Sequence, residues 1–258
     1  MITSFDSYLS SGKREMLSSI TSQNELLREL LSVPAANDLV RDLKVVTLSV
    51  NQVLYEQGDY IDYVYFPLDS VTSGLAIMED GTTIETAMVG REGLVGISTI
   101  LGSGRSQQWI WVTVGGKAIQ VDSRAIDRLF VQNESALKAL LHCYRSLVTQ
   151  VSQRCVCNSR HTIMERLCSW LLMIHDRVGQ GNLNLTQEMI ASRVGARRAG
   201  ITVAAGMLQE MGAIEYRRGR LHITDRAMLE QVVCECYSQM RWEPQTVSSE
   251  STPSFHYK

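Results

Sequence analysis

The spacing of apolar residues divides the chain into a strand-rich first half and a helical second half. From about residue 38 to residue 121, short runs of β-branched and aromatic residues alternate with clusters of Gly, Asp and Ser. Short strands at this spacing are typical of a barrel or a sandwich. The runs predict strands at about 45–48, 52–55, 63–66, 71–78, 82–89, 109–114 and 117–121.

Two of the predicted connections contain a dipeptide typical of tight turns. Asp80-Gly81 lies between the fourth and fifth runs, and Gly115-Gly116 lies between the last two. A two-residue hairpin turn of the favoured type needs positive φ at both central residues, which Gly adopts readily. The pattern therefore predicts a hairpin at each dipeptide.

After residue 123 the apolar period becomes that of a helix. Between residues 137 and 151 one helical face is apolar, and it has few acidic neighbours. Such a face either packs the helix on its own β-domain or pairs it with the same helix of a second chain, and the spacing is compatible with both. The residues on this face are Leu137, Leu140, Leu141, Tyr144, Leu147, Val148 and Val151.

Further helices are predicted before the strands, within residues 1–36, and after residue 160. Leucines at helical spacing before Pro34 indicate short helices within residues 1–36. The last dozen residues are rich in Ser and Thr, and we expect them to form a disordered tail. In between, the pattern predicts helices at about 161–178, 186–194, 197–211 and 226–240, with two short strands around Arg218-Gly219.

The formal net charge of -2 conceals an uneven distribution of charge. Residues 37–122 carry five basic and eleven acidic side chains, whereas residues 123–226 carry fifteen basic and eight acidic ones. Such asymmetry suggests a nucleic-acid partner for the basic part, although a solvated helix face gives the same pattern.

Neither the termini nor the cysteines indicate secretion or a membrane span. The N-terminus lacks a basic start followed by an apolar stretch, and no apolar run approaches the roughly 20 residues that a bilayer span needs. The six cysteines form no dense framework, which fits a reducing compartment. We therefore expect a cytoplasmic protein.

Residues 185–208 have the pattern of a helix-turn-helix motif. Thr186 is a good N-cap for a first helix, and Gly195 suits the left-handed residue that ends it. A second helix follows within two or three residues. In such a motif the second helix presents its N-terminal residues to the major groove of DNA. The buried side of this second helix consists of Ile201, Ala204, Ala205 and Leu208.

Polar and basic residues occupy the positions of this motif that would face DNA. At the start of the second helix, Arg197, Arg198 and Thr202 are available, and Arg can bind guanine O6 and N7 in bidentate fashion. Three more arginines lie at the tip of the predicted hairpin, where a wing would contact phosphates. The alternative is a helical hairpin with a solvated basic face, but the order of these features favours DNA binding. The hairpin arginines are Arg217, Arg218 and Arg220.

Together these features resemble the catabolite activator/FNR (Crp/Fnr) superfamily of bacterial transcription regulators, over about residues 37–226. The resemblance rests on Gly58-Asp59 after a strand, the glycine-rich segment 90–96 before the run at 109–114, the long helix, and residues 185–208 with their wing. It implies an α+β fold with an N-terminal cyclic-nucleotide-binding-like β-barrel, a long dimerisation helix and a C-terminal winged helix.

The resemblance also implies a domain division and a set of partners. The partners are double-stranded DNA with a palindromic operator, a second copy of the chain and RNA polymerase, and there is no membrane contact. The dimer would form through Leu137, Leu141, Tyr144, Val148 and Val151. The domains are the N-terminal helices (1–36), the sensor barrel (37–122), the dimerisation and linker helix (123–160), the winged helix (161–246) and the tail (247–258).

Individual DNA-facing residues follow from the same resemblance. Thr186 matches the family's phosphate-contacting residue, with Gln187 beside it, and Arg198 matches the base-reading arginine. The chain departs from the family at Ala199 and Val203, which replace a Glu and a second recognition Arg. We therefore expect an operator that differs from the best-known consensus, with Arg197 taking part in reading.

The predicted sensor holds few residues for the ligands known in such folds. Residues 37–122 contain no His for a metal enzyme, and the first cysteine is Cys143, which excludes an iron–sulfur cluster in the N-terminal half. Gly96 and the pair Arg105-Ser106 resemble parts of the family's cyclic-nucleotide cassette. Ile97, however, stands where the family has a ribose-binding Glu. We therefore expect another effector or none.

The remaining candidate is formed by two Cys-x-Cys pairs, Cys155/Cys157 and Cys234/Cys236. They would make a zinc or redox site if they met in space, but a free cysteine is usually a small buried hydrophobe. We therefore expect no cofactor, no metal and no catalytic residue. The competing function is a small-molecule-binding barrel protein or an enzyme whose C-terminal half mediates protein contacts, although no nucleophile–base pair or phosphate loop supports it.

Overall fold

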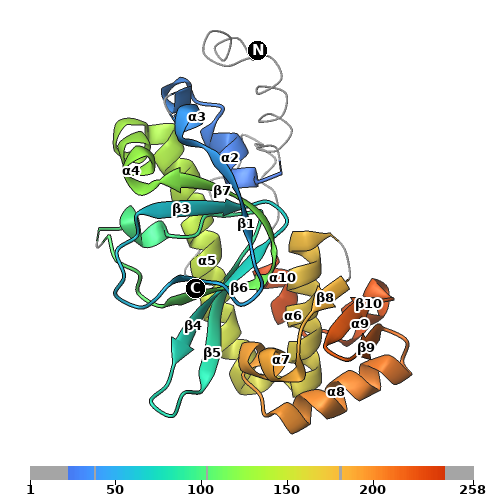
Figure 1. The fold of residues 1–258 in the computed structure, drawn as a ribbon. Helices are drawn as coiled ribbons and strands as arrows, with labels where there is room; N and C mark the ends of the chain where they lie inside the picture. The colour runs from blue at the N-terminus through green and yellow to red at the C-terminus, as the bar shows by residue number, and fades with distance from the viewer. Residues whose placement is uncertain (1–22, 38, 103, 180–181, 242–258) are drawn as a thin grey trace, which may run out of the picture.

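The computed structural model describes residues 23–241, apart from residues 38, 103, 180 and 181. The predicted tail and the first 22 residues lie outside this range. The strand-rich part and the helical part lie side by side, with β5 next to α7, and the long helix α5 (Glu134–Arg160) runs behind the sheets toward the helical part (Figure 1). This arrangement confirms the predicted α+β class.

The seven strands lie where the apolar pattern predicted them, but they do not close into a barrel. They form two antiparallel sheets, with strand orders β1-β7-β3 and β2-β6-β4-β5. Among the described residues, no strand of one sheet pairs with a strand of the other. The strands are β1 (Lys44–Leu48), β2 (Val53–Tyr55), β3 (Tyr63–Pro67), β4 (Val71–Ile77), β5 (Thr83–Val89), β6 (Trp109–Val114) and β7 (Gly116–Asp122).

Of the two predicted hairpin turns, at Asp80-Gly81 and at Gly115-Gly116, only the first is present. β4 and β5 pair across Asp80-Gly81, where Gly81 has φ +81°. The hairpin expected at Gly115-Gly116 is wrong, because β6 pairs with β2 and β4 whereas β7 pairs with β1 and β3. The chain changes sheets there, and a Cβ on Gly116 would lie 2.5 Å from Asp69 Oδ1. The absence of a side chain at Gly116 therefore lets Asp69 pack closely against this backbone, and the glycine does not form a hairpin turn.

Short helices surround the sheets, and the segment 123–160 contains two helices rather than one. Asn133 separates them, since it is extended and its side chain accepts a hydrogen bond from the Ala136 amide at 2.9 Å, which begins α5. No described helix is both long and apolar enough to cross a bilayer. The other helices here are α2 (Glu25–Leu30), η1 (Pro34–Asn37), α3 (Leu39–Asp42), η2 (Ile97–Thr99) and α4 (Ser123–Gln132).

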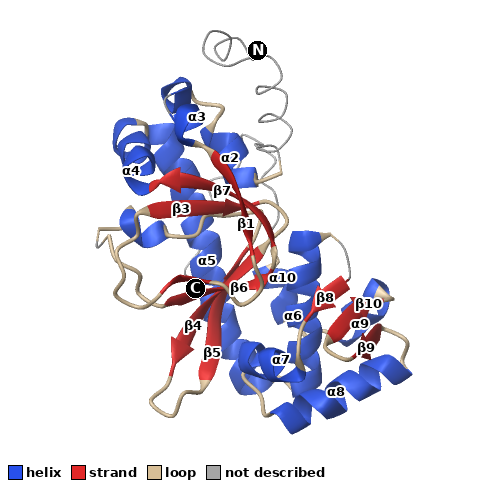
Figure 2. Cartoon of the chain, viewed as in Figure 1, coloured by secondary structure: helices blue, strands red, loops and turns tan. Residues whose placement is uncertain are grey.

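The C-terminal part is a helical domain with a small sheet (Figure 2). Two features differ from the predicted pattern. The helix expected at 226–240 is two helices, because Val233 is extended, and a third strand joins the two expected ones in the order β8-β10-β9. The elements are α6 (Ile163–Val178), β8 (Asn182–Asn184), α7 (Gln187–Val194), α8 (Arg198–Glu210), β9 (Ile214–Arg217), β10 (Arg220–Ile223), α9 (Arg226–Val232) and α10 (Cys236–Met240).

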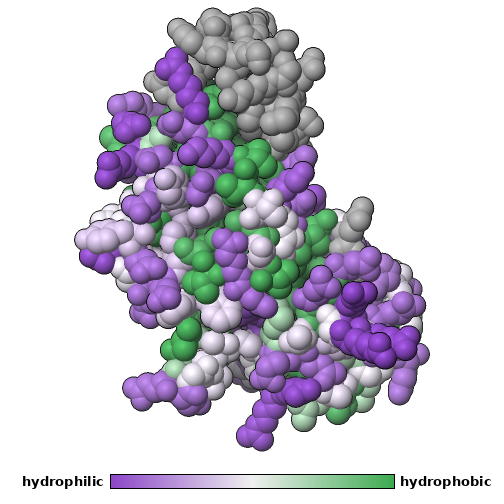
Figure 3. Space-filling model, viewed as in Figure 1, coloured by the Kyte–Doolittle hydropathy of each residue, from purple (hydrophilic) through white to green (hydrophobic). Residues whose placement is uncertain are grey.

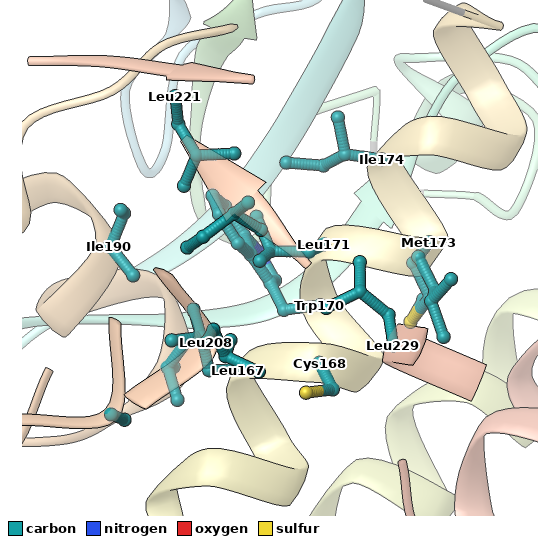
Figure 4. Packing of buried hydrophobic residues seen from close by; sticks show 14 of the residues in the cluster. Leu167, Cys168, Trp170, Leu171, Met173, Ile174, Ile190, Leu208, Leu221 and Leu229 are labelled. Carbon is teal, nitrogen blue, oxygen red and sulfur yellow. The ribbon is translucent and has the colours of Figure 1, made fainter. Parts of the chain in front are cut away.

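Helix α6 lies at the centre of the largest hydrophobic core. Its side chains, among them Trp170 and Leu171, lie among residues from α7, α8, β10 and α9 (Figure 4). The same cluster includes Val71 and Met88 of the β2-β6-β4-β5 sheet. One continuous apolar core therefore joins the strand-rich and helical parts.

A buried ionic cluster lies at this junction. The Glu85 side chain on β5 is fully buried and forms ion pairs with Arg154 of α5 at 2.8 Å and Arg193 of α7 at 3.8 Å. Trp170 of α6 donates from Nε1 to Glu85 Oε1 at 3.0 Å. Burial lowers the pKa of the Arg193 guanidinium, and the Glu85 charge opposes that shift. One carboxylate therefore contacts side chains from three helices.

We expect Glu85→Ala to lower the free energy of unfolding by about 3–5 kcal/mol, because two buried arginines would lose their counter-charge. Urea unfolding followed by circular dichroism measures this change. Glu79→Ala, at an exposed position on the adjacent loop, should change the free energy by less than about 0.5 kcal/mol. Equal losses in the two variants would contradict the assigned role of the cluster.

Candidate nucleic-acid interface

Helices α7 and α8 form a helix-turn-helix whose ends follow from local sequence. The Thr186 hydroxyl accepts a hydrogen bond from the Met189 amide at 3.1 Å and caps α7. Gly195 ends α7 with φ +68° and ψ 45°, a left-handed conformation that favours glycine. Residues 195–197 form the turn, and α8 begins at Arg198.

The inner faces of both helices are buried, which leaves the start of α8 at the surface. The Thr202 hydroxyl lies 2.9 Å from Gln187 Oε1 and 3.1 Å from the Arg198 carbonyl oxygen, so it links the starts of the two helices. Further along α8, Val203 and Met207 are also exposed. The buried residues are Ile190, Ala191, Val194, Ile201, Ala204, Ala205 and Leu208.

The β9–β10 hairpin lies directly beside the start of α7. Its turn residues, Arg218 and Gly219, both have positive φ, as a two-residue hairpin turn of this type requires. The Leu185 amide donates to the Gly219 carbonyl at 2.8 Å, and the Tyr216 hydroxyl donates to the Leu185 carbonyl at 2.8 Å. Burial raises the pKa of Tyr216, which favours the protonated, donating hydroxyl.

The residues assigned to DNA from the sequence therefore lie in one region. A Cβ on Gly219 would lie 3.8 Å from Thr186 Cγ2, so the wing tip adjoins the cap of α7. Figure 3 shows hydrophilic residues gathered over β9 and β10. Gln187 is half-buried, and the other seven are exposed: Thr186, Arg197, Arg198, Thr202, Arg217, Arg218 and Arg220.

The arginines at the start of α8 adjoin the strand-rich part, and no pattern in the sequence predicts this contact. Arg197 and Arg198 line a surface hollow of about 760 Å³ together with the β4–β5 hairpin. At this contact the Ser192 hydroxyl of α7 donates to the Thr83 carbonyl at 2.9 Å. The contact joins residues 109 positions apart, and no local pattern marks it.

Three arginines of the basic segment 123–226 are unavailable to DNA. Arg154 and Arg193 contact Glu85, and Arg177 is buried with Glu92, whose Oε1 accepts from Arg177 Nε at 2.7 Å. Both glutamates belong to the acidic segment 37–122. Part of the charge asymmetry in the sequence therefore reflects pairing between the two halves of the chain rather than a nucleic-acid partner.

The candidate effector residues do not converge on one cavity. Gly96 and Ser106 line a cavity of about 70 Å³, well below the roughly 300 Å³ at which ligand pockets begin. Arg105 does not line it, since its guanidinium stacks 3.6 Å above the Tyr60 ring and donates to the Gly58 carbonyl at 2.7 Å.

The Gln108 side chain also lines this cavity. Its Oε1 accepts a hydrogen bond from the Thr86 hydroxyl at 2.6 Å. A Cβ on Gly74 would overlap Gln108 Nε2, so the amide packs against the β4 backbone. The Gln108 amide therefore fills the space next to Gly74, and its oxygen already has a protein partner.

The apolar face of α5 is split between the chain's own core and the surface. Leu140 is fully buried, whereas Leu147 and Val151 are half-buried. The other four apolar residues of this face are exposed, and they follow one another at spacings of four, three and four residues, which is the spacing along a coiled-coil seam. Their exposed fractions are 37% for Leu137, 49% for Leu141, 37% for Tyr144 and 44% for Val148.

Comparison with known proteins identifies the helical domain. Residues 165–232, which span α6 to α9, match the Crp-like helix-turn-helix domain. No curated protein sequence matches the chain. The helix-turn-helix and its wing are therefore of the Crp type.

Solved structures show the same fold over most of the chain. FixK2 from Bradyrhizobium japonicum matches with a TM-score of 0.64 at 14% identity and covers 74% of this chain and 98% of its own. A CRP-family regulator from Thermus thermophilus, TTHB099, matches with 0.60 at 16% identity, covering 72% and 95%. The c-di-GMP responsive regulator CLP of Xanthomonas campestris matches with 0.58 at 14% identity, covering 74% and 98%. The predicted resemblance to the Crp/Fnr fold is therefore confirmed, with a Crp-like helix-turn-helix domain in its C-terminal part.

We expect substitution by alanine to change the free energy of unfolding in opposite directions at two glycines of this motif. Gly195→Ala should lower the free energy of unfolding by about 1–2 kcal/mol, because alanine is strained at positive φ. Gly206→Ala should raise it by about 0.5–1 kcal/mol, because this glycine lies inside α8 with no atom within 4 Å of the added Cβ. Urea unfolding of both variants tests the prediction, and equal signs would contradict the left-handed end of α7.

Proposed function

We propose that this chain, which has the Crp/Fnr fold and a Crp-like helix-turn-helix domain, is a homodimeric, sequence-specific transcription regulator of the cytoplasm. The observation that carries the proposal is the single exposed region formed by Thr186, the start of α8 and the wing tip. Backbone and side-chain hydrogen bonds hold these three parts together.

Within this region we assign different roles to different side chains. Arg198, at the first turn of α8, reads a base edge in the major groove, and Arg197 assists it. Thr186 and the wing residue Arg218 contact phosphates, which orient the protein without reading sequence. Arg217 and Arg220, opposite each other on β9 and β10, extend the phosphate contact.

The exposed face of α5 supports a two-fold dimer. Leu141 and Tyr144 would lie at the centre of a parallel pair of helices, which removes four large apolar side chains from water. With a two-fold axis along this seam, we propose that the two copies of α8 enter successive major grooves. The proposed operator is therefore palindromic, with half-sites about one helical turn apart, and RNA polymerase is the expected further partner.

The contact between the β4–β5 hairpin and α7 supports control of DNA binding by the strand-rich domain. A change in this sheet would move Thr83 and with it Ser192 on α7, next to the turn before α8. CLP is described as c-di-GMP responsive. For this chain we propose an effector other than cAMP, or none, since Ile97 offers no acceptor for a ribose and Arg105 is directed to Tyr60.

Substitution of two arginines separates base reading from phosphate contact. We expect Arg198→Ala to weaken binding to a selected operator by about 1–3 kcal/mol and to relax specificity there. Arg218→Ala should weaken binding to all duplexes and reduce the slope of affinity against salt by about one. Fluorescence anisotropy with a duplex selected from genomic fragments, over a range of salt concentrations, measures both effects.

Arg28→Ala is the matched control, because Arg28 is exposed on α2, far along the chain from the motif. The Arg28→Ala variant should bind the selected operator and other duplexes with the affinity of the wild-type protein. If Arg198→Ala and Arg218→Ala also left the affinity unchanged, the assigned roles would be wrong. A dimer that shifts no duplex at low salt would favour the competing function, a small-molecule-binding protein or enzyme whose C-terminal half binds proteins.

A charge on the α5 seam should disrupt the dimer. We expect Leu141→Glu to produce monomers in analytical ultracentrifugation and to abolish cooperative binding to the two half-sites, because two charges would be buried together. Val131→Glu places the same charge on an apolar residue of α4 that is 79% exposed, and it should remain dimeric. A dimeric Leu141→Glu variant would show that α5 is not the interface.

A further inference from the structure

Four metal-binding side chains meet between the end of α5 and the start of α10. The Sγ atoms of Cys157 and Cys234 are 3.6 Å apart, and Cys236 Sγ is 3.5 Å from His161 Nδ1. One donor atom from each of the four residues lies within 4.8 Å of the others. The three cysteines are buried, and the His161 side chain is 13% exposed.

Two of the four side chains come from the end of α5 and two from the start of α10. Cys157 and His161 are four residues apart, so they share one face at the end of α5, and the His161 amide donates to the Cys157 carbonyl at 3.0 Å. Cys234 and Cys236 are separated by one residue where the chain enters α10. Of the two Cys-x-Cys pairs in the sequence, only the second contributes both members, since Cys155 is exposed.

Two of the distances between ligand atoms, Cys157 Sγ–Cys234 Sγ and Cys236 Sγ–His161 Nδ1, already match those of tetrahedral zinc. With Zn–S near 2.3 Å and Zn–N near 2.0–2.1 Å, a tetrahedron separates two sulfurs by about 3.8 Å and a sulfur from a nitrogen by about 3.5 Å. Three thiolates and one imidazole form a soft donor set that favours Zn²⁺ over harder cations. We propose that each chain binds one Zn²⁺ ion through Cys157, His161, Cys234 and Cys236.

Neighbouring groups are positioned to support such an ion. His161 Nε2 lies 3.3 Å from Glu235 Oε2, the arrangement in which a carboxylate orients a ligating histidine and leaves Nδ1 for the metal. Gln153 Nε2 lies 3.1 Å from Cys236 Sγ and can donate to a thiolate there. Four protein ligands complete the coordination, so the site is structural rather than catalytic.

The ion would link α10 to the end of α5. Cys157 lies in the last turn of α5 and His161 is its C-cap, whereas Cys234 and Cys236 follow α9, beyond the wing. The metal therefore closes the helical domain back onto α5. This inference is independent of the proposed DNA binding, since none of the four ligands belongs to the DNA-facing set.

The first measurement is made on the wild-type full chain purified under reducing conditions. Elemental analysis should find one zinc per chain. After removal of the metal with chelator and reductant, titration with Co²⁺ should give the visible bands of tetrahedral cobalt and thiolate-to-cobalt charge transfer, and Zn²⁺ should displace the cobalt. Absence of zinc together with absence of these bands would overturn the proposal.

Substitutions test which side chains bind the metal. Cys236→Ser and His161→Ala should lose the tetrahedral cobalt spectrum, whereas Cys155→Ser, which alters an exposed thiol on the same helix, should retain it. Glu235→Gln should fold normally, because its side chain is 83% exposed, and weaken zinc binding by about 10–100-fold. Equal behaviour of Cys155→Ser and Cys236→Ser would contradict the assigned ligands.

Thiol counting addresses the alternative that Cys157 and Cys234 form a disulfide. Alkylation of the denatured, chelator-treated protein without reductant should label all six cysteines of the chain. Labelling of only four would show a disulfide and overturn the zinc assignment. Thermal unfolding adds a further readout, since chelation should lower the midpoint in wild type and in Cys155→Ser, and added zinc should restore it.

Discussion

The buried carboxylate of Glu85 is the interaction on which the arrangement of the two halves depends. A carboxylate in an apolar interior is tolerated only with charged and hydrogen-bonding partners around it. Here those partners come from helices outside the sheet: Arg154 of α5, Trp170 of α6 and Arg193 of α7. Because each helix must bring its side chain to β5, this cluster holds α5, α6 and α7 against the sheet, together with the apolar core that they share with Val71 and Met88.

Helix α5 carries the exposed apolar face and also contacts the sheet, α7 and α10. Its exposed apolar face lies toward its first half, and Gln150 binds the Met88 backbone of β5 through its side-chain amide. One turn later Arg154 contacts Glu85, and the next turn carries Cys157 and its cluster. The proposed dimer seam, the contacts with β5 and α7, and the proposed zinc ligand Cys157 therefore follow one another along this helix.

Charge serves two purposes in this molecule, and the distinction requires the structure. Arg177 and Arg193 are buried against glutamates of the strand-rich half, where they contribute to the join between domains. Arg198 and Arg218 are exposed in the helix-turn-helix and its wing, where water and salt surround them. Counting all arginines in one segment overstates the charge that DNA would meet.

The sequence by itself determined the local structure, because hydrophobic period, caps and turn residues act over a few positions. It located the seven strands and helices α6 to α8, the cap at Thr186, the left-handed Gly195 and the wing turn at Arg218-Gly219. The strand β8 escaped it, since three residues are too few to show a period.

Only the tertiary structure decided which distant elements meet. A period shows which side of a strand is buried, but it does not show which neighbour covers that side. The sheet change at Gly115, the partners of Glu85 and the meeting of Cys157 with Cys234, 77 residues away, therefore have no local signal. The physical reason is that these contacts arise from packing two layers together, which depends on the whole chain rather than on any short segment.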